Sequence, residues 1–414
     1  PVKRKCIFSG KGFIMLCKDN AMRHQADIVI IGTGIAGVSA AFAAHTAAPQ
    51  ARVHLIGEEP GLPYKRTSLS KHLVDPEIPD NTLPQWVSGQ PLPFTLRSGT
   101  EIVSLDGQTR TVTAINGNTI SAGAVILATG SLPRQPRCGW GRRILGFRTQ
   151  ADALAVRTLW RESRTVLIGG SGVLAVELAC QAAASCKTVT MAGRNRQILA
   201  RHFDAESATR LEALLADHGI RFLPEVDIDE IIVSEGRPFL ERVPAGFDGA
   251  IIAAGTTPAT ALAVTAGLEP DPGIPVDEYS RTRMTGIFAA GDCSSRNGLV
   301  TNLWHQAQAQ GQNAGANAAA ALVGAPLIPY CVVPQRVKCR IFDCFTWSCN
   351  HTCEHDIAEC IERGGAFLRL LFKSGGLAGA SAIGIDEALD KPLSRAVSEH
   401  WSIDRVRREI LAGG

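Results

Sequence analysis

Two segments of the chain share one pattern: a short β-branched strand, a glycine-rich turn and an Ala-rich helix. They are ADIVIIGTGIAGVSAAFAA at 26–44 and RTVLIGGSGVLAVELACQAA at 164–183. Each is followed by a further short strand, at 52–59 and 187–194. Strand, glycine turn, helix and strand are the opening of a βαβ unit that binds a dinucleotide. Because a second copy makes a chance match improbable, the sequence predicts two Rossmann-like dinucleotide-binding domains.

The first turn reads Gly32-Thr-Gly34-Ile-Ala-Gly37. Gly32 permits the tight turn, Gly34 lets a pyrophosphate approach the backbone, and Gly37 lets the helix pack close to the strand. Glu58 or Glu59, at the end of the next strand, is placed to accept hydrogen bonds from a ribose. The alternative is a tight turn without a ligand. The second turn offers the matching set Gly170, Gly172 and Ala175.

The remaining strands indicate how the chain is divided. Apolar strands at 123–134 and 249–260 end in glycine, and 286–294 runs into Gly-Asp. After Ala325 the segment 328–349 is expected to form strands, and 367–384 a hairpin that turns at Ser374–Gly376 and precedes a helix. The predicted class is α/β, with one Rossmann-like domain inserted in the other and a C-terminal α+β cap. The predicted parts are an N-terminal extension at 1–25, a first dinucleotide-binding domain at 26–145 and 263–325, a second at 146–262, and the cap at 326–414.

Composition narrows the possible partners. Of the 414 residues, 45% are hydrophobic and 20% charged, and the net charge is only +3. No dense Lys/Arg block with interleaved aromatics appears, which argues against nucleic-acid binding. No apolar run reaches the roughly 18 residues of a membrane span, and no signal peptide is recognisable. We therefore expect a soluble cytoplasmic protein without a membrane partner, either a monomer or a homodimer.

These features together resemble the FAD-dependent pyridine nucleotide-disulfide oxidoreductase superfamily. Besides the two turns, the resemblance is carried by the strand ends Ala128-Thr129-Gly130, Ala254-Gly255 and Gly291-Asp292. It covers roughly residues 26–385. It implies that the first turn holds the ADP portion of FAD and that the second holds NADPH or NADH. It also implies that Asp292 hydrogen-bonds the ribityl-phosphate region of FAD.

The branch of the superfamily is indicated by a missing cysteine. Disulfide, peroxide and coenzyme A disulfide reductases carry a redox cysteine soon after the first βαβ unit, but no cysteine occurs here from residue 18 to 137. In its place PYKRTSLSK (63–71) is similar to a stretch of the reductases that serve rubredoxin, ferredoxins and oxygenase electron carriers. The segment 379–397 is similar to the rubredoxin-reductase cap. This resemblance implies hydride transfer from NAD(P)H to FAD and electron release to a small acidic iron-sulfur or rubredoxin-type carrier.

The resemblance also assigns roles to individual residues. Arg66 matches an arginine that supports FAD, and Lys71 matches a lysine beside flavin N5. Glu177 matches the glutamate that pairs with this lysine, which makes Lys71 and Glu177 the expected catalytic pair. Trp304 is expected to form a wall on the flavin, and Arg134 to contact an FAD phosphate. The alternatives are that Lys71 and Glu177 never meet, that Trp304 is an ordinary core residue and that Arg134 is solvated.

Coenzyme choice depends on the end of the strand after the second turn. An NAD site expects an acid there for the ribose diol, but Gly193 stands in its place. Arg194 and Arg196 follow, and guanidinium groups bind a 2′-phosphate well. The sequence therefore favours NADPH, or use of both coenzymes, over strict NADH. Alternatively, both arginines point to solvent.

The late cysteines do not predict a metal site. Cys349, His351, Cys353 and His355 alternate, so on a strand they would share one face. Such positions span about 20 Å, too far to converge on one tetrahedral ion unless the strand bends. We expect no metal ligands there.

Two other functions stay open at this point. One is an NAD(P)H oxidase or the flavoprotein subunit of a heteromeric dehydrogenase. The other is a non-enzymatic, redox-responsive flavin-binding regulatory protein. Basic residues at 134–143 and 336–340 favour a carrier reductase, because they would steer an acidic partner.

Overall fold

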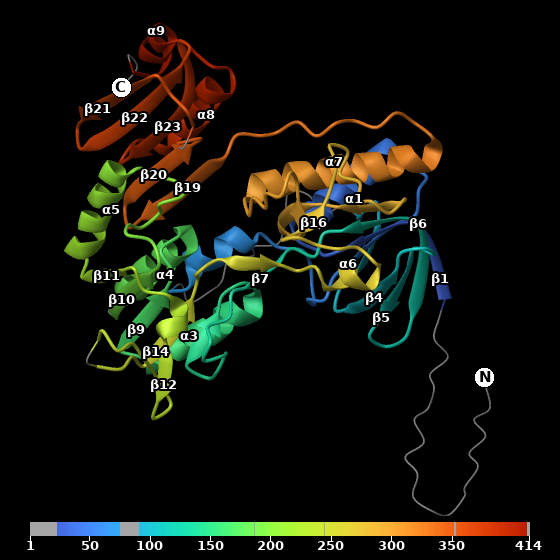
Figure 1. The fold of residues 1–414 in the computed structure, drawn as a ribbon, viewed down its shortest axis with the longest axis horizontal. Coiled ribbons are helices and arrows are strands. Elements are labelled where there is room, and N and C mark those ends of the chain that lie inside the picture. The colour runs from blue at the N-terminus through green and yellow to red at the C-terminus, as the bar shows by residue number, and fades with distance from the viewer. Residues whose placement is uncertain (1–22, 75–90, 186, 244, 352, 412–414) are drawn as a thin grey trace, which may run out of the picture.

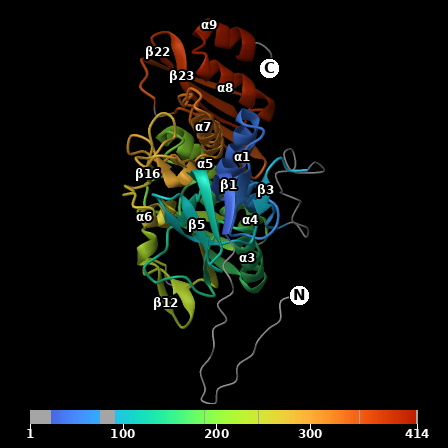
Figure 2. The same ribbon diagram turned by 90° about the vertical axis from the view of Figure 1, so that its right-hand side faces the viewer.

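Three β-sheets divide the chain into three parts (Figure 1). The computed structural model describes residues 23–74, 91–185, 187–243, 245–351 and 353–411. Most of the predicted N-terminal extension at 1–25 lies outside the described residues. In the view of Figure 2, the C-terminal sheet stands at one end of the molecule.

The first sheet has strand order β3-β2-β1-β6-β5-β4, with β17 beside β6. Its strands are β1 (Arg23–Ile31), β2 (Val53–Ile56), β3 (Thr95–Arg97), β4 (Ile102–Asp106), β5 (Thr111–Ala114), β6 (Thr119–Leu127) and β17 (Ile287–Ala289). Helices α1 (Ile35–Ala47) and α7 (Trp304–Val323) pack together beside it (Figure 1). A Cβ atom at Gly311 or Gly315 of α7 would lie 2.1 Å from a carbonyl oxygen of α1. Only glycine permits this contact, which holds the middle of α7 against the first turns of α1.

The second sheet is wholly parallel, in the order β11-β10-β9-β14-β8. Its strands are β8 (Ile144–Gly146), β9 (Thr165–Gly169), β10 (Thr188–Gly193), β11 (Ile220–Pro224) and β14 (Gly249–Ile252), with helices α3 (Gln150–Glu162), α4 (Val173–Ala184) and α5 (Ala205–Asp217). The chain returns to the first sheet at β17, so the predicted insertion of one domain in the other is confirmed. The two crossings, β7 (Ser131–Pro133) and β15 (Thr256–Pro258), pair as an antiparallel ribbon. The exact boundaries stay predictions, and β8 spans the one placed at 145.

The C-terminal sheet is antiparallel, in the order β19-β20-β23-β22-β21. Its strands are β19 (Arg336–Ile341), β20 (Cys344–Cys349), β21 (Ile357–Arg363), β22 (Ala366–Lys373) and β23 (Gly376–Ile383), followed by α8 (Asp390–Ser398) and α9 (Ile403–Val406). The predicted hairpin is confirmed, with Ser374 and Gly375 at φ values of +51° and +80°. The expectation of strands from 328 was wrong for 328–335, which run back along α7 without forming a strand (Figure 1).

Cys349, His351, Cys353 and His355 do not lie on one strand, so the shared face considered for a strand does not form. Strand β20 ends at Cys349, and Asn350 turns the chain with a φ of +48°. Within the described ranges, no group of three or more His, Cys, Asp or Glu side chains could hold a metal ion. Likewise, none of the described helices is both long and apolar enough to cross a bilayer.

Short elements complete the described chain. They are β12 (Ile232–Ser234), β13 (Arg237–Phe239), β16 (Ile274–Pro275), β18 (Ser294–Ser295), α6 (Ala261–Thr265), the 3-10 helices η1 (Arg66–His72), η2 (Ile228–Glu230), η3 (Gly291–Cys293) and η4 (Glu387–Leu389), and the π-helix η5 (Arg407–Leu411).

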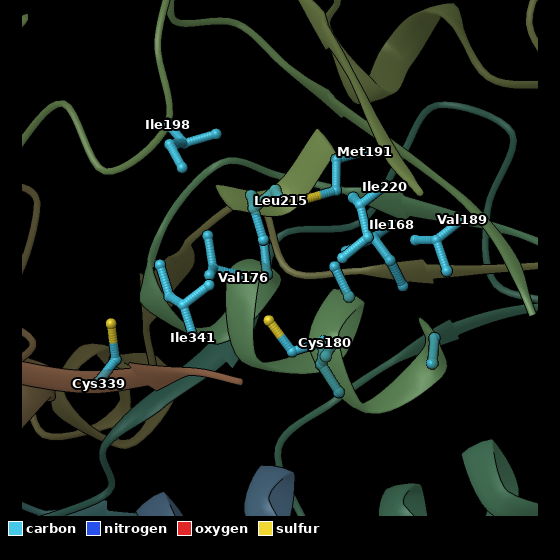
Figure 3. Close-up of a cluster of buried hydrophobic side chains, with 14 of the residues drawn as sticks. Ile168, Val176, Cys180, Val189, Met191, Ile198, Leu215, Ile220, Cys339 and Ile341 are labelled. Atoms are coloured by element: carbon cyan, nitrogen blue, oxygen red, sulfur yellow. The ribbon is translucent and has the colours of Figure 1, made fainter. Parts of the chain in front are cut away.

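The C-terminal sheet shares a hydrophobic core with the second sheet. Cys339 and Ile341 of β19 lie in the same buried cluster as Val176 and Cys180 of α4 and Leu215 of α5 (Figure 3). Burial of this apolar surface fixes the cap against the second dinucleotide-binding domain.

Asp390, the first residue of α8, joins this helix to the C-terminal sheet. Its carboxylate, 6% exposed, accepts hydrogen bonds from Trp347 Nε1 at 2.9 Å and Lys338 Nζ at 3.1 Å, and pairs with Arg336 at 3.3 Å. Burial alone would raise the pKa of Asp390, but Arg336 and Lys338 more than offset it and hold the pKa below its ordinary value. Asp390 therefore stabilises the fold above the unfolded-state pKa, and this stability is lost as pH falls through the folded-state pKa.

We predict that Asp390→Asn lowers the free energy of unfolding by about 2 kcal/mol, because the buried carboxylate loses its charge-assisted hydrogen bonds with Arg336 and Lys338. The matched control is Glu387→Gln, which removes a half-exposed carboxylate from Lys338 and Arg340 and should cost less than about 1 kcal/mol. Urea unfolding followed by tryptophan fluorescence at neutral pH measures both. Equal losses for the two variants would contradict this account.

Candidate functional site

In the first glycine turn, Gly32 and Gly37 lie against the backbone of neighbouring segments, whereas Gly34 faces open space. A Cβ atom at Gly32, whose φ is +112°, would lie 2.1 Å from the carbonyl oxygen of Ala128. One at Gly37 would lie 1.8 Å from the carbonyl oxygen of Gly32, whereas one at Gly34 would have nothing within 4 Å. The N–H groups at the start of α1 are therefore accessible to a pyrophosphate, so the turn fits a dinucleotide.

The second turn repeats this geometry. A Cβ atom at Gly170, with a φ of +141°, would lie 2.3 Å from the carbonyl oxygen of Ala253, while one at Gly172 would meet nothing within 4 Å. Ala175 is fully buried in α4. The turn borders a pocket that is completed by the end of β10, the segment 199–202 and Gly255 at the end of β14.

Three arginines line this pocket at the second glycine turn, which we call the second pocket: Arg134, Arg194 and Arg201. Arg134 and Arg194 lie 3.0 and 3.5 Å from Asp227. The structure thus places Arg134 at this pocket, and the expectation that it contacts an FAD phosphate stays a prediction. Arg196 is 88% exposed, pairs with Glu225 at 3.0 Å and does not line the pocket, and its role as a coenzyme ligand stays a prediction.

Sequence reasoning missed Arg201 and His202. Both residues lie on an irregular segment that carries no glycine motif. In the sequence, only their position a few residues after Arg194 pointed to the coenzyme site. Burial, together with repulsion by His351 and Arg201, lowers the pKa of His202 to about 4, so its ring is neutral at neutral pH.

A polar network follows β2 beside the first turn. The Tyr64 hydroxyl donates to Glu59 Oε2 at 2.5 Å, and Arg66 forms an ion pair with the same carboxylate. Arg66 Nη1 also donates to the Tyr64 hydroxyl at 2.9 Å and to the carbonyl of Arg148 at 3.0 Å. Burial raises the pKa of Tyr64 well above its ordinary value, which keeps the hydroxyl a donor. Glu58 is exposed and stands outside this network.

Asp292 lies where the first sheet meets the ribbon between the domains. Its Oδ2 accepts hydrogen bonds from Ser131 Oγ and Arg148 Nη2, each at 3.0 Å. Arg148 therefore links Asp292 to Arg66, a role that the sequence did not suggest. The Thr129 hydroxyl donates to the carbonyl of Ala259 at 2.5 Å. The strand-end glycines with positive φ are Gly130, Gly255 and Gly291.

The elements that carry Lys71 and Glu177 meet between the two dinucleotide-binding domains, and the pairing of these two side chains stays a prediction. Helix η1, which carries Ser70 and Lys71, contacts α4, which carries Glu177. The direct hydrogen bond comes from Ser70 Oγ, at 2.5 Å from Glu177 Oε2. Burial raises the pKa of Glu177, and both Ser70 and the charge of Lys71 act against this rise.

Trp304 begins α7 and is partly buried. The ammonium group of Lys65 lies 5.5 Å from the centroid of its ring. Burial lowers the pKa of Lys65, and the charges of Lys71 and Lys338 add to the effect. Because the charges of Lys71 and Lys338 act on Lys65, we call Lys65, Lys71 and Lys338 the lysine cluster, of which Lys65 is the member beside Trp304.

Comparison with curated proteins finds clear relatives. The ferredoxin–NAD(+) reductase subunit of the benzene 1,2-dioxygenase system of Pseudomonas putida is 33% identical over 282 residues, which cover 65% of this chain and 67% of the relative. A rubredoxin–NAD(+) reductase of the same species is 30% identical over 290 residues, 67% of this chain and 73% of the relative. The assimilatory nitrate reductase electron transfer subunit of Bacillus subtilis is 26% identical over 369 residues, 86% of this chain but 47% of the relative.

Solved structures agree on the fold. A ferredoxin reductase from Rhodopseudomonas palustris superposes with a TM-score of 0.80 over 92% of this chain and 96% of its own, at 23% identity. The family model described as pyridine nucleotide-disulphide oxidoreductase matches residues 26–311, which hold both glycine turns and the Ser70–Glu177 contact. The chain belongs to the pyridine nucleotide-disulphide oxidoreductase family.

Proposed function

We propose that this chain is an NAD(P)H-dependent FAD reductase that passes electrons to a small ferredoxin or rubredoxin. The observation that carries the proposal is the convergence of two open glycine turns on one junction that holds a buried carboxylate, Glu177. Both turns fit dinucleotides, as FAD and a nicotinamide coenzyme require. When bound, FAD accepts a hydride from the nicotinamide and yields electrons one at a time.

The protein's own residues bind and orient the reactants in this scheme. Gly34 and the N-terminus of α1 receive the pyrophosphate of FAD. The Glu59–Tyr64–Arg66 network fixes the chain that follows β2. Lys71 places positive charge where negative charge develops during reduction, and Glu177, anchored by Ser70, keeps that charge in position. No cysteine between residues 18 and 137 is available for a thiol relay, so the electrons leave toward an external acceptor.

The acceptor assignment is supported by the names of the relatives and by the lysine cluster. The basic segments at 134–143 and 336–340 offer less free charge than their sequence suggests, because several of their cations are paired with carboxylates. Lys65 is different, since among the described residues it has no carboxylate within ion-pair distance. It is the cation best placed to attract an acidic carrier to the edge of Trp304.

A second candidate is the flavoprotein part of a larger reductase, which the Bacillus subtilis relative favours. Reduction of a panel of rubredoxins and ferredoxins with NADPH and NADH in air-saturated buffer, with cytochrome c as terminal reporter and an oxygen electrode in parallel, tests the first proposal. Rapid carrier reduction with little oxygen consumption is expected. Oxygen consumption with no carrier reduced would exclude it.

NADPH is the coenzyme that the second pocket favours. No carboxylate lines the pocket among the described residues, whereas three arginines do. An acid would bind a ribose diol and repel a 2′-phosphate, and arginines do the reverse. Arg201 has no carboxylate within ion-pair distance among the described residues, so its guanidinium is available. The relatives' names specify NAD(+), which makes the coenzyme a direct test of this reading.

For the coenzyme, Arg201→Ala and Arg194→Ala should each lower kcat/KM for NADPH at least about tenfold and change kcat/KM for NADH little. The reason is that a charge-assisted hydrogen bond to the 2′-phosphate contributes about 1.5–3 kcal/mol. Arg196→Ala, which removes an arginine outside the pocket, is the control and should match the wild type. A tenfold preference of the wild type for NADH would overturn this prediction.

For Lys71, replacement by Met should slow reduction of the flavin by about tenfold, because the lost charge acts in the transition state. The dissociation constant of the coenzyme should change little. Stopped-flow absorbance under anaerobic conditions separates the two quantities. If the reduction rate is unchanged, Lys71 does not stand beside the flavin.

For Lys65, the charge reversal Lys65→Glu should slow carrier reduction by about tenfold at low salt and by little near molar salt, since steering is screened. Flavin reduction by the coenzyme should stay at the wild-type rate. Lys373→Glu makes the same charge change on β22 and is the control. Equal effects of the two variants would exclude a specific role for Lys65.

A further inference from the structure

The segment that brings Arg201 and His202 to the coenzyme pocket is held by several elements. The N–H of Ile198 donates to Glu212 Oε1 at 2.9 Å, and the N–H of Leu199 donates to the carbonyl of Ser171 at 2.7 Å. Leu199 itself has a φ of +53°, a conformation that a leucine keeps only when its surroundings impose it. The segment's shape is therefore set by its contacts.

One of these contacts comes from the C-terminal sheet. Ser348, on β20 and 2% exposed, donates a hydrogen bond from its Oγ to the carbonyl oxygen of His202. The carbonyl belongs to a residue that lines the coenzyme pocket. A side chain of the cap thus fixes backbone at the edge of a site that lies in another domain.

Further contacts between the cap and the second dinucleotide-binding domain lie close to this hydrogen bond. Arg369 of β22 pairs with Asp204 at 3.1 Å, directly after the segment. The His351 ring lies 6.5 Å from the ring of His202. Ile198 belongs to the buried cluster that also contains Ile341 of β19 (Figure 3). The cap therefore contacts the segment at His202 and contacts Asp204 just after it.

We propose that Ser348 is a positioning residue for the nicotinamide coenzyme, holding segment 199–202 in the conformation that presents Arg201 to the ligand. This inference rests on the proposed function, because it concerns the coenzyme of that reaction. Ser348 touches no coenzyme and acts through the carbonyl of His202. Without its hydroxyl, the carbonyl of His202 loses this hydrogen-bond donor and the segment relaxes away from the bound conformation.

The proposal makes the cap part of coenzyme binding. Contacts with the cap order segment 199–202 before the coenzyme binds. Binding therefore does not have to offset the conformational entropy that is lost when the segment becomes ordered. Loss of the contact should weaken binding and leave the chemical step of the bound complex unchanged.

The test compares Ser348→Ala with the control Ser381→Ala. Ser381 is the cross-strand neighbour of Ser348 on β23 and is also 2% exposed, so its replacement removes the same atom from the same sheet. For Ser348→Ala we expect about a tenfold rise in KM for the preferred coenzyme, with kcat and the flavin spectrum unchanged. Titration calorimetry with the oxidised coenzyme, NADP+ or NAD+, should show the same weakening without turnover. Ser381→Ala should match the wild type in both measurements.

Two further variants keep the test decisive. Ser348→Cys, similar in size but a weaker donor, should give an intermediate affinity, and it replaces Ser348→Ala if that variant does not fold. Ser348→Thr keeps the hydroxyl and should retain most of the affinity. Equal affinities of wild type, Ser348→Ala and Ser348→Cys, or equal losses in Ser348→Ala and Ser381→Ala, would overturn the proposal. If neither coenzyme reduces the flavin of the wild type, the proposed function fails instead.

Discussion

Contact between one backbone segment and another at the two glycine turns is the constraint on which the rest of the structure depends. A Cβ atom at Gly32, Gly37 or Gly170 would lie only 2.1, 1.8 or 2.3 Å from a backbone carbonyl oxygen, far closer than two non-bonded atoms can approach. The helices can therefore begin directly against their strands, with their N–H groups directed outward. At Gly311 and Gly315 the same absence of a side chain lets α7 pack directly against α1.

The candidate site follows from joining two such units. The ribbon of β7 and β15 ties the domains together at the carboxyl ends of their strands, and η1 reaches across to α4. Glu177 is buried in this contact and takes its hydrogen bond from Ser70, one residue before Lys71. A carboxylate in such a place needs a nearby cation or donor to remain charged, and both come from the other domain. The residues of the proposed reaction thus meet at a domain interface. The contact by which Ser348 is proposed to position the coenzyme segment also crosses between two domains.

Local pattern was enough to predict the strand–turn–helix units and the hairpin at Ser374, because each is encoded within a short stretch of sequence. The inserted topology was predicted from the order of these units and of the later strands along the whole chain. The meeting of η1 with α4 came from resemblance and agrees with the geometry. Arg134 and Arg196 could not be placed in this way, since their positions are set by Asp227 and Glu225, carboxylates that are distant in sequence. The same holds for the residues that were missed. Arg148 reaches Asp292, and Ser348 reaches His202, across 144 and 146 positions of the chain.

The measurement that tests the central claim most directly is an anaerobic titration of the FAD-reconstituted protein with NADPH, and with NADH in parallel. The account predicts one non-covalently bound FAD per chain, whose absorbance is bleached by about one equivalent of coenzyme, since a hydride carries both electrons. Addition of an oxidised ferredoxin or rubredoxin should then restore the flavin absorbance. A protein that retains no FAD, or whose bound FAD neither coenzyme bleaches, would contradict the account.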